Sequence, residues 1–290
     1  MSLFFAAELR RELSFRNREY ACRHSLGCRE SYGDPPVVCY IPSEDGLGHG
    51  NFLPTTYRAI LKNDNWRRRL SKAHSHGGRA IPREERRWNE LDSCNSSDAL
   101  LMNIFCFPGT LKQRRVLDLL GTESGHVPEF GYRPRIPLLN GHVERTEVDM
   151  RLGDLLVEAK LTESDFQSTE PTLVENYRDL EEVFDRRSLP REGKRYLSYQ
   201  LIRNVLAAHA SDRAFCVVAD ARRPDLREAW YAVLRCVRSA TLRTRCQMLT
   251  WQELSAVLPR KLRDFLEEKY GITSDEPQSS INDVIERAAS

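Results

Sequence analysis

The stretch "RTEVDMRLGDLLVEAK", residues 145–160, decides how this chain is expected to fold. Two runs with strand character, 145–152 and 155–161, flank Gly153-Asp154. A Gly-Asp pair between two such runs is typical of a two-residue hairpin turn, because glycine accepts the positive φ that the turn requires. The sequence therefore predicts a β-hairpin at this point of the chain.

Side chains alternate between the two faces of a strand, which gives this hairpin one apolar and one charged face. The apolar face comprises Val148, Met150, Leu152, Leu155, Val157, Ala159 and Leu161. The other face comprises Glu147, Asp149, Arg151, Glu158 and Lys160, with Leu156 as its one apolar member. The turn also predicts four opposed pairs, which are Leu152 with Leu155, Met150 with Val157, Asp149 with Glu158, and Glu147 with Lys160.

The opposition of Asp149 and Glu158 is unfavourable in an ordinary strand pair. Opposed Cβ atoms lie about 5 Å apart, so two carboxylates repel unless a cation lies between them or one takes up a proton. A divalent metal ion, which prefers oxygen ligands, meets that need. Lys160 adds a compact ammonium group in a chain with seven lysines and 37 arginines, and an ammonium group is more readily tuned than guanidinium. The alternative is a solvated face on which Glu147 and Lys160 form an ion pair.

Asp149, followed by an apolar strand that ends in Val157-Glu158-Ala159-Lys160, resembles the D…(D/E)-x-K signature of the PD-(D/E)XK, or restriction-endonuclease-like, nuclease superfamily. The resemblance implies that Asp149 and Glu158 hold a divalent metal, Mg²⁺ or Mn²⁺, and that Lys160 positions or activates the attacking water. The superfamily's leading proline is absent, because Val148 precedes Asp149.

Composition places the chain among soluble globular proteins. Its 290 residues are 40% apolar and 30% charged, and the net charge of +2 creates no global basic field that demands nucleic acid. No apolar run reaches the roughly 20 residues that span a bilayer, and the apolar start is too short for a signal peptide. We therefore expect a cytoplasmic protein without membrane contact, whose eight cysteines are reduced thiols.

The order of the expected elements predicts an α/β fold. A lead over 1–20 has helical character, and further helices are expected over 55–73, 95–108, 112–121, 171–185, 196–210 and 224–240. Strands are expected over 127–137 at a sheet edge, in the hairpin, over 213–220, and in "CQMLTWQEL", which runs into a helix from Trp251. A short helix is expected to close the chain after 274–280. This layout predicts a central mixed β-sheet flanked by helices, and it resembles the restriction-endonuclease-like core over roughly residues 95–255.

The expected elements divide the chain into three segments. Residues 1–90 are expected to form a loop-rich and helical N-terminal extension, residues 91–273 the nuclease-like core, and residues 274–290 a C-terminal tail.

Several further residues are candidates for auxiliary roles. Glu129 lies on the strand before the hairpin and Glu147 lies on its charged face, so either could supply an extra metal ligand. Gln200 shares a helix face with Arg203, and some related exonucleases carry a glutamine on the equivalent helix. Asp98 opens the helix at 95–108, where the resemblance implies an acid that sometimes assists the metal; the alternative is a plain N-terminal cap.

Basic clusters are the candidates for phosphate contact, because arginine binds phosphate in a bidentate manner. The arginines concerned are Arg67, Arg68, Arg69, Arg114 and Arg115. A solvated charged face is the alternative for each of them.

Cys22, Cys28 and Cys39, with His24 or His49 nearby, could form a structural Zn²⁺ site, although their spacing matches no tight pair of zinc ligands. The leading hypothesis from the sequence is a Mg²⁺-dependent nuclease that hydrolyses phosphodiester bonds in DNA through Asp149, Glu158 and Lys160. The alternatives are a non-catalytic nucleic-acid-binding protein with the same fold, and a zinc-stabilised interaction module.

Overall fold

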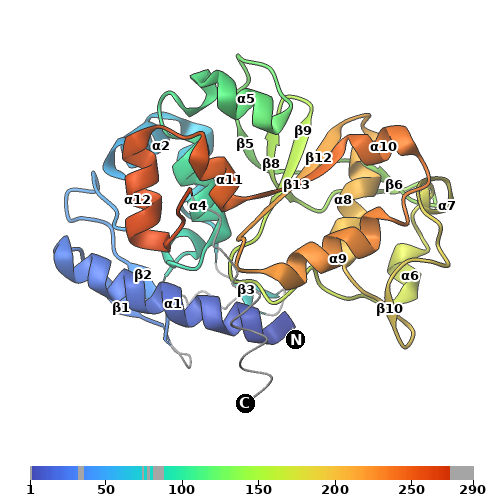
Figure 1. The fold of residues 1–290 in the computed structure, drawn as a ribbon, viewed down its shortest axis with the longest axis horizontal. Coiled ribbons are helices and arrows are strands. Elements are labelled where there is room, and N and C mark those ends of the chain that lie inside the picture. The colour runs from blue at the N-terminus through green and yellow to red at the C-terminus, as the bar shows by residue number, and fades with distance from the viewer. Residues whose placement is uncertain (1, 32–35, 74, 77–78, 81–87, 275–290) are drawn as a thin grey trace.

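The computed structural model describes residues 2–31, 36–73, 75–76, 79–80 and 88–274. A five-stranded sheet lies at its centre, in the order β13-β12-β9-β8-β5 (Figure 1). The strands are β5 Glu129–Tyr132, β8 Val148–Leu152, β9 Leu155–Ala159, β12 Ala214–Ala219 and β13 Cys246–Thr250. Strands β5, β8 and β9 pair antiparallel, whereas β9, β12 and β13 pair parallel, so the sheet is mixed.

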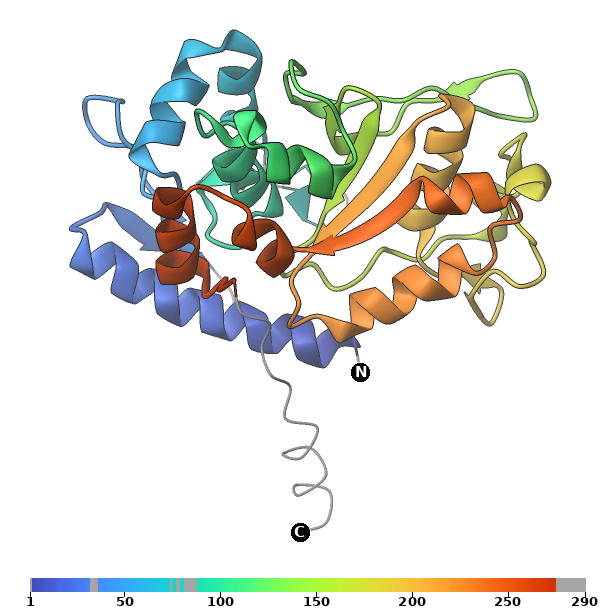
Figure 2. The same ribbon diagram turned by 45° about the horizontal axis from the view of Figure 1, so that its top comes forward.

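Helices cover both faces of this sheet (Figures 1 and 2). They are α1 Ser2–Arg23, α2 Pro54–Lys62, α3 Asp64–Arg69, α4 Ser97–Phe105, α5 Arg114–Leu120, α6 Pro171–Val174, α7 Leu180–Val183, α8 Tyr199–Ala210, α9 Pro224–Leu234, α10 Ala240–Thr244, α11 Trp251–Ala256 and α12 Arg260–Tyr270. One face packs against α1, α4, α11 and α12, and the other against α8 and α9. The expected fold class, a mixed sheet flanked by helices, is confirmed.

Shorter elements lie outside the central sheet. They are the two-stranded pairs β1 Cys28–Glu30 with β2 Val38–Tyr40, β3 Ser75–His76 with β4 Arg79–Ala80, β6 Ile136–Pro137 with β7 Val143–Glu144, and β10 Arg191–Glu192 with β11 Arg195–Tyr196, and the 3-10 turns at Glu90–Asp92 and Thr110–Lys112.

Local sequence explains where the central elements begin and turn. The Ser96 hydroxyl accepts a hydrogen bond from the Ala99 N–H and so caps α4, a role for which serine is well suited. Strand β12 is continuously apolar because its residues alternate between the two cores, with Phe215 on one face and Cys216 on the other. The hairpin turn is confirmed as well, since Gly153 has φ +58°.

The hairpin register is confirmed near the turn and wrong at its far end. Met150 pairs with Val157 and Leu152 with Leu155, as predicted, but the ladder stops there. The side chain of Val148 packs in the core with Leu156 rather than with Met150, so the apolar face is shorter than expected.

Two of the helices expected from periodicity are broken. The segment 55–73 contains α2 and α3, because the Asn63 side chain accepts hydrogen bonds from Asn65 N–H and Trp66 N–H and starts a new helix. The segment 171–185 contains only the single turns α6 and α7. The short closing helix expected after 274–280 lies outside the described residues.

The N-terminal helix α1 packs against the C-terminal end of α12, whose axis crosses that of α1 (Figure 2). Leu9 and Leu13 of α1 belong to the same apolar cluster as one face of the sheet. Between the helices, Lys269 Nζ donates to Asn17 Oδ1 at 2.7 Å. Within the described ranges, no helix combines the length and the apolar character that crossing a bilayer requires.

Candidate active site

The Asp149 carboxylate reaches from β8 to β9 just beyond Met150–Val157, the last backbone pair of the hairpin. Its Oδ2 accepts a hydrogen bond from the Ala159 backbone N–H at 2.7 Å. The side chain therefore takes the place of a backbone acceptor from β8, which explains why no Asp149–Glu158 backbone pair forms. The consequence is that Asp149 binds the backbone of the residue that follows Glu158.

Glu158 and Lys160 form a buried ion pair beside Asp149. Lys160 Nζ lies 2.8 Å from Glu158 Oε1. The second carboxylate oxygen, Oε2, accepts from the Asn204 amide of α8 at 2.9 Å. Glu158 is 2% exposed and Lys160 is 4% exposed. Both charges are therefore largely removed from water, where each interaction is stronger than at a surface.

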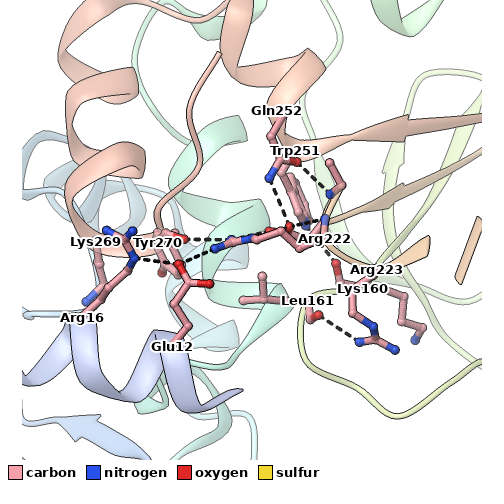
Figure 3. Close-up of polar contacts among 12 residues, drawn as sticks. Glu12, Arg16, Lys160, Leu161, Arg222, Arg223, Trp251, Gln252, Lys269 and Tyr270 are labelled. Atoms are coloured by element: carbon pink, nitrogen blue, oxygen red, sulfur yellow. Dashed lines mark hydrogen bonds and ion pairs between the residues drawn. The ribbon is translucent and has the colours of Figure 1, made fainter. Parts of the chain in front are cut away.

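The backbone of Lys160 is held from two sides. Its N–H donates to Val218 O of β12 at 2.8 Å. Its carbonyl accepts from the Trp251 indole at 2.9 Å (Figure 3). The next carbonyl, that of Leu161, accepts from the buried Arg223 guanidinium at 3.2 Å, also drawn in Figure 3. These contacts tie the end of β9 to the neighbouring strand and to α11, so the ammonium group extends from a fixed backbone.

A third acid, Asp98 of α4, lies in the same region. It is 4% exposed and pairs with Arg69 Nη2 at 2.9 Å and with Lys72 Nζ at 2.5 Å. Burial by itself raises the pKa of Asp98, but Lys72 and Arg69 outweigh that effect and hold the pKa below its ordinary value. Glu147 joins the group, because its Oε1 lies 2.6 Å from Arg69 Nη2.

The pKa of Asp149 is raised well above its ordinary value, first by burial and then by the negative charges of Glu158 and Asp98. The pKa of Lys160 is also raised: burial lowers it, but Glu158, Glu163 and Asp149 outweigh burial. Negative charge thus exceeds positive charge around Asp149 and Lys160. A proton on Asp149 or a bound cation would relieve the repulsion there.

The residues present fit a magnesium-type ion. Mg²⁺ is held in proteins by one or two carboxylates, with waters and substrate phosphate completing its shell. Asp149 and Glu158 supply two carboxylates, and no described residue donates to Asp149 Oδ1. Asp98 Oδ1 is buried and likewise accepts no hydrogen bond. In the described part of the chain, no group of three or more His, Cys, Asp or Glu side chains is arranged for metal binding, so the fit rests on the pair.

The auxiliary candidates occupy different places. Glu129 pairs with Arg151 on the outer part of the sheet. Glu147 pairs with Arg69 and Lys72, so the alternative in which it pairs with Lys160 is wrong. The physical reason is that the ladder ends before Glu147, and its side chain turns towards α3.

Helix α8 contacts the acids through residues that follow Gln200. Gln200 Oε1 is buried without a hydrogen-bond donor among the described residues. Asn204, four residues later and hence on the same helix face, is the one that donates to Glu158. Arg203 donates to the Glu147 carbonyl at 3.2 Å.

Sequence reasoning missed Asn204, Lys72 and the supporting Trp251. Asn204 had a usable signal, which is its spacing of four from Gln200. Lys72 is one of only seven lysines in the chain, the same scarcity that drew attention to Lys160. Trp251 had no signal, because nothing local to a sequence tells which carbonyl a buried indole reaches.

The basic candidates divide by exposure. Arg69 is largely buried between Asp98 and Glu147, with 12% of its side chain exposed. Arg67 and Arg68 lie exposed on α3, where Arg67 pairs with Asp64. Arg114 and Arg115 lie exposed on α5, where Arg114 pairs with Asp118.

The three cysteines of the zinc hypothesis differ in environment. Cys22 and Cys28 are exposed, whereas Cys39 is buried, and burial raises the pKa of the Cys39 thiol to about 12. A raised pKa disfavours the thiolate form that binds zinc.

A comparison with protein-family models matches residues 10–271 of the chain to the family described as Restriction Endonuclease associating with ARP. No curated protein and no solved structure matches the chain.

Proposed function

Because this chain belongs to the family described as Restriction Endonuclease associating with ARP, we propose that it is a metal-dependent nuclease that hydrolyses phosphodiester bonds in DNA. Asp149, Glu158 and Lys160 are its proposed catalytic residues, with Mg²⁺ or Mn²⁺ as its cofactor. The family supports a restriction-endonuclease-like protein, and the geometry of the site supports the proposed metal and residue roles.

One observation carries the proposal: the side chains of two carboxylates and one ammonium group come together where β8 and β9 separate. Lys160 Nζ lies 2.8 Å from Glu158. Asp149 binds the backbone between those two residues. A structural hairpin has no need of a carboxylate beside Asp149 that raises the pKa of Asp149 further. The arrangement therefore suits a reaction that brings its own positive charge.

Each residue has a role that its surroundings support. A bound divalent ion would acidify water and offset the charge of the scissile phosphate. Asn204 fixes the orientation of Glu158, because it donates to Oε2 and leaves further lone pairs of the carboxylate for a ligand. Lys160 stays protonated and can donate to a phosphate oxygen as negative charge develops there. Trp251 and Arg223 hold the backbone from which the ammonium group extends.

The family description names association with ARP. We propose that this chain also acts together with a partner of that kind, and that the partner contributes to the choice of substrate. Co-purification of the tagged chain with a co-expressed ARP tests this part of the proposal, and failure of the two to co-purify would contradict it.

A second function is favoured by one observation, which is that both oxygens of Glu158 already have donors within the protein. A closed ion pair of this kind would also suit a protein that binds nucleic acid without cleaving it. The two proposals differ in whether Asp149 and Lys160 are needed for a chemical step.

The test incubates the full chain with supercoiled plasmid, linear duplex and single-stranded DNA, with Mg²⁺, Mn²⁺ or EDTA. We expect cleavage that requires the metal and is lost in Asp149→Asn and in Lys160→Ala. Asp149→Asn is nearly isosteric and can still accept from the Ala159 N–H, so its fold should be retained. Glu181→Gln is the matched control, because it removes an exposed acid of α7 that pairs with Arg186 and is not a candidate site residue.

Cleavage that survives both site substitutions would assign the activity to another site or to a contaminant. Binding without cleavage in every metal would favour the non-catalytic alternative.

A further inference from the structure

A pocket of about 740 Å³ opens beside the proposed active site, between α3 and β5. Arg69 and Lys72 line this pocket and also bind Asp98 and Glu147. The same two cations therefore contact both the pocket and the acids Asp98 and Glu147. Any ligand in the pocket lies next to the chain segment that carries Asp149.

The contact between Arg69 and β5 at this pocket depends on Gly131, which has no side chain. Gly131 of β5 has φ +68°, and a Cβ at this position would lie 2.4 Å from Arg69 Nη1 and 3.0 Å from Glu147 Cδ. The Arg69 guanidinium thus fits against β5 only because residue 131 has no side chain. That close approach joins α3 and β5 at the base of the pocket.

One side of the pocket is apolar. Trp66 donates its indole N–H to Pro128 O at 2.9 Å and packs edge-on against Phe130, with ring centroids 6.4 Å apart. Val127, which is 60% exposed, continues this wall towards solvent. The indole is held in place before any ligand arrives, which favours contact with a flat group.

Four cationic side chains also line the pocket, namely Arg68, Arg69, Lys72 and Arg133. Arg68 and Arg133 are the exposed ones. Arg68 donates to the Asn65 side chain, and Arg133 has no charged partner among the described residues. The acid that lines the pocket, Glu129, is paired with Arg151. The balance of charge therefore selects an anionic ligand.

We propose that this pocket receives one unpaired nucleotide of the substrate strand, with its base against the wall of Trp66 and Val127 and its phosphates against Arg68 and Arg133. An apolar wall beside phosphate-binding cations matches a nucleotide, and a concave site admits a base only after it leaves the stack. The volume lies within the roughly 300–1,000 Å³ typical of ligand pockets. This inference rests on the proposed function for its substrate and adds a preference for DNA with an unpaired base near the cleavage position.

The test measures fluorescence anisotropy of a labelled duplex with a one-thymidine bulge and of the same duplex fully paired, in EDTA and 150 mM salt. We expect wild type to bind the bulged duplex several-fold more tightly. The double variant Arg68→Ala/Arg133→Ala should lose about tenfold in affinity for the bulged duplex, since each arginine contacts phosphate. Val127→Asp, an exposed change that keeps the core intact, should also abolish the preference.

Arg227→Ala/Arg243→Ala is the matched control, because it removes two exposed arginines from α9 and α10 that do not line the pocket. We expect it to lose less than about twofold, since exposed charges more than a Debye length apart are screened at this salt concentration. Equal binding of the two duplexes by wild type, or an equal loss in the control, overturns the pocket proposal.

Binding in EDTA needs no cleavage, so the two proposals fail separately. A bulge preference that depends on Arg68 and Arg133 without any metal-dependent cleavage overturns the nuclease proposal alone. Cleavage without a bulge preference overturns the pocket proposal alone.

Discussion

Replacement of Lys160 by methionine would leave the Glu158 carboxylate charged inside the protein without its partner. The two groups are 2.8 Å apart, and at an effective dielectric constant of about 20 their gross attraction is about 6 kcal/mol. Desolvation of both ions offsets part of this attraction, and removal of one partner of a buried pair typically costs about 3–5 kcal/mol. Methionine has a similar volume, so packing should contribute little to the loss.

We therefore expect Lys160→Met to lower the free energy of unfolding by about 3–5 kcal/mol at pH 7. The double variant Glu158→Gln/Lys160→Met should recover about 2 kcal/mol or more, because it removes the unpaired charge. Urea unfolding followed by tryptophan fluorescence and far-UV circular dichroism measures both values. Asn204 still donates to residue 158 in the double variant, so the local fold should persist.

Two results would refute this reasoning. A loss below about 1 kcal/mol in Lys160→Met would mean that the pair is solvated, as surface pairs are. A double variant as unstable as the single one would mean that the loss comes from packing rather than from charge.

Three further predictions concern the scaffold of the site. Gly131→Ala should lower the free energy of unfolding by about 1–3 kcal/mol in thermal or urea unfolding, since the residue has positive φ and the new Cβ would meet Arg69; no change would mean that Arg69 moves aside freely. Trp251→Phe removes the buried hydrogen bond to the Lys160 carbonyl and should cost about 1–3 kcal/mol, whereas an unchanged midpoint in the same assay would show that this carbonyl finds another donor. Burial lowers the pKa of Lys269 well below its ordinary value. Between that folded pKa and about 10.4, the unfolded chain therefore binds one more proton than the folded chain. In this range the free energy of unfolding rises by about 1.4 kcal/mol per pH unit. The advantage of Lys269→Met over wild type should accordingly be largest at low pH and shrink as pH rises, and a difference independent of pH between 7 and 9 would contradict the lowered pKa.

Several features could be read from the sequence because they depend on neighbours along the chain. The hairpin follows from Gly153 and from the alternation on either side of it. The helix α4 follows from the serine at its start, and the buried strand β12 from its uninterrupted apolar run. Each of these signals acts over a few residues, where backbone conformation and periodicity are set directly by local chemistry.

Features that depend on contacts between distant segments could not be read in this way. The end of the ladder at Met150–Val157 depends on an acid that bonds to a backbone N–H, and the pairing of Glu147 depends on α3, more than seventy residues earlier in the chain. Periodicity gives no information on which distant cation a carboxylate will meet. The break of the segment 171–185 into single turns likewise reflects tertiary packing that overrides helix propensity.

By itself, the sequence determined that this chain has a mixed α/β core with two acids and a lysine on one hairpin, because alternation and turn chemistry are local. Only the tertiary structure decided that Lys160 binds Glu158, that Asp98 and Asn204 surround the acids, and that Arg69 connects them to a pocket. Burial and charge are properties of the assembled interior, where the free energy of each ion depends on every group packed around it.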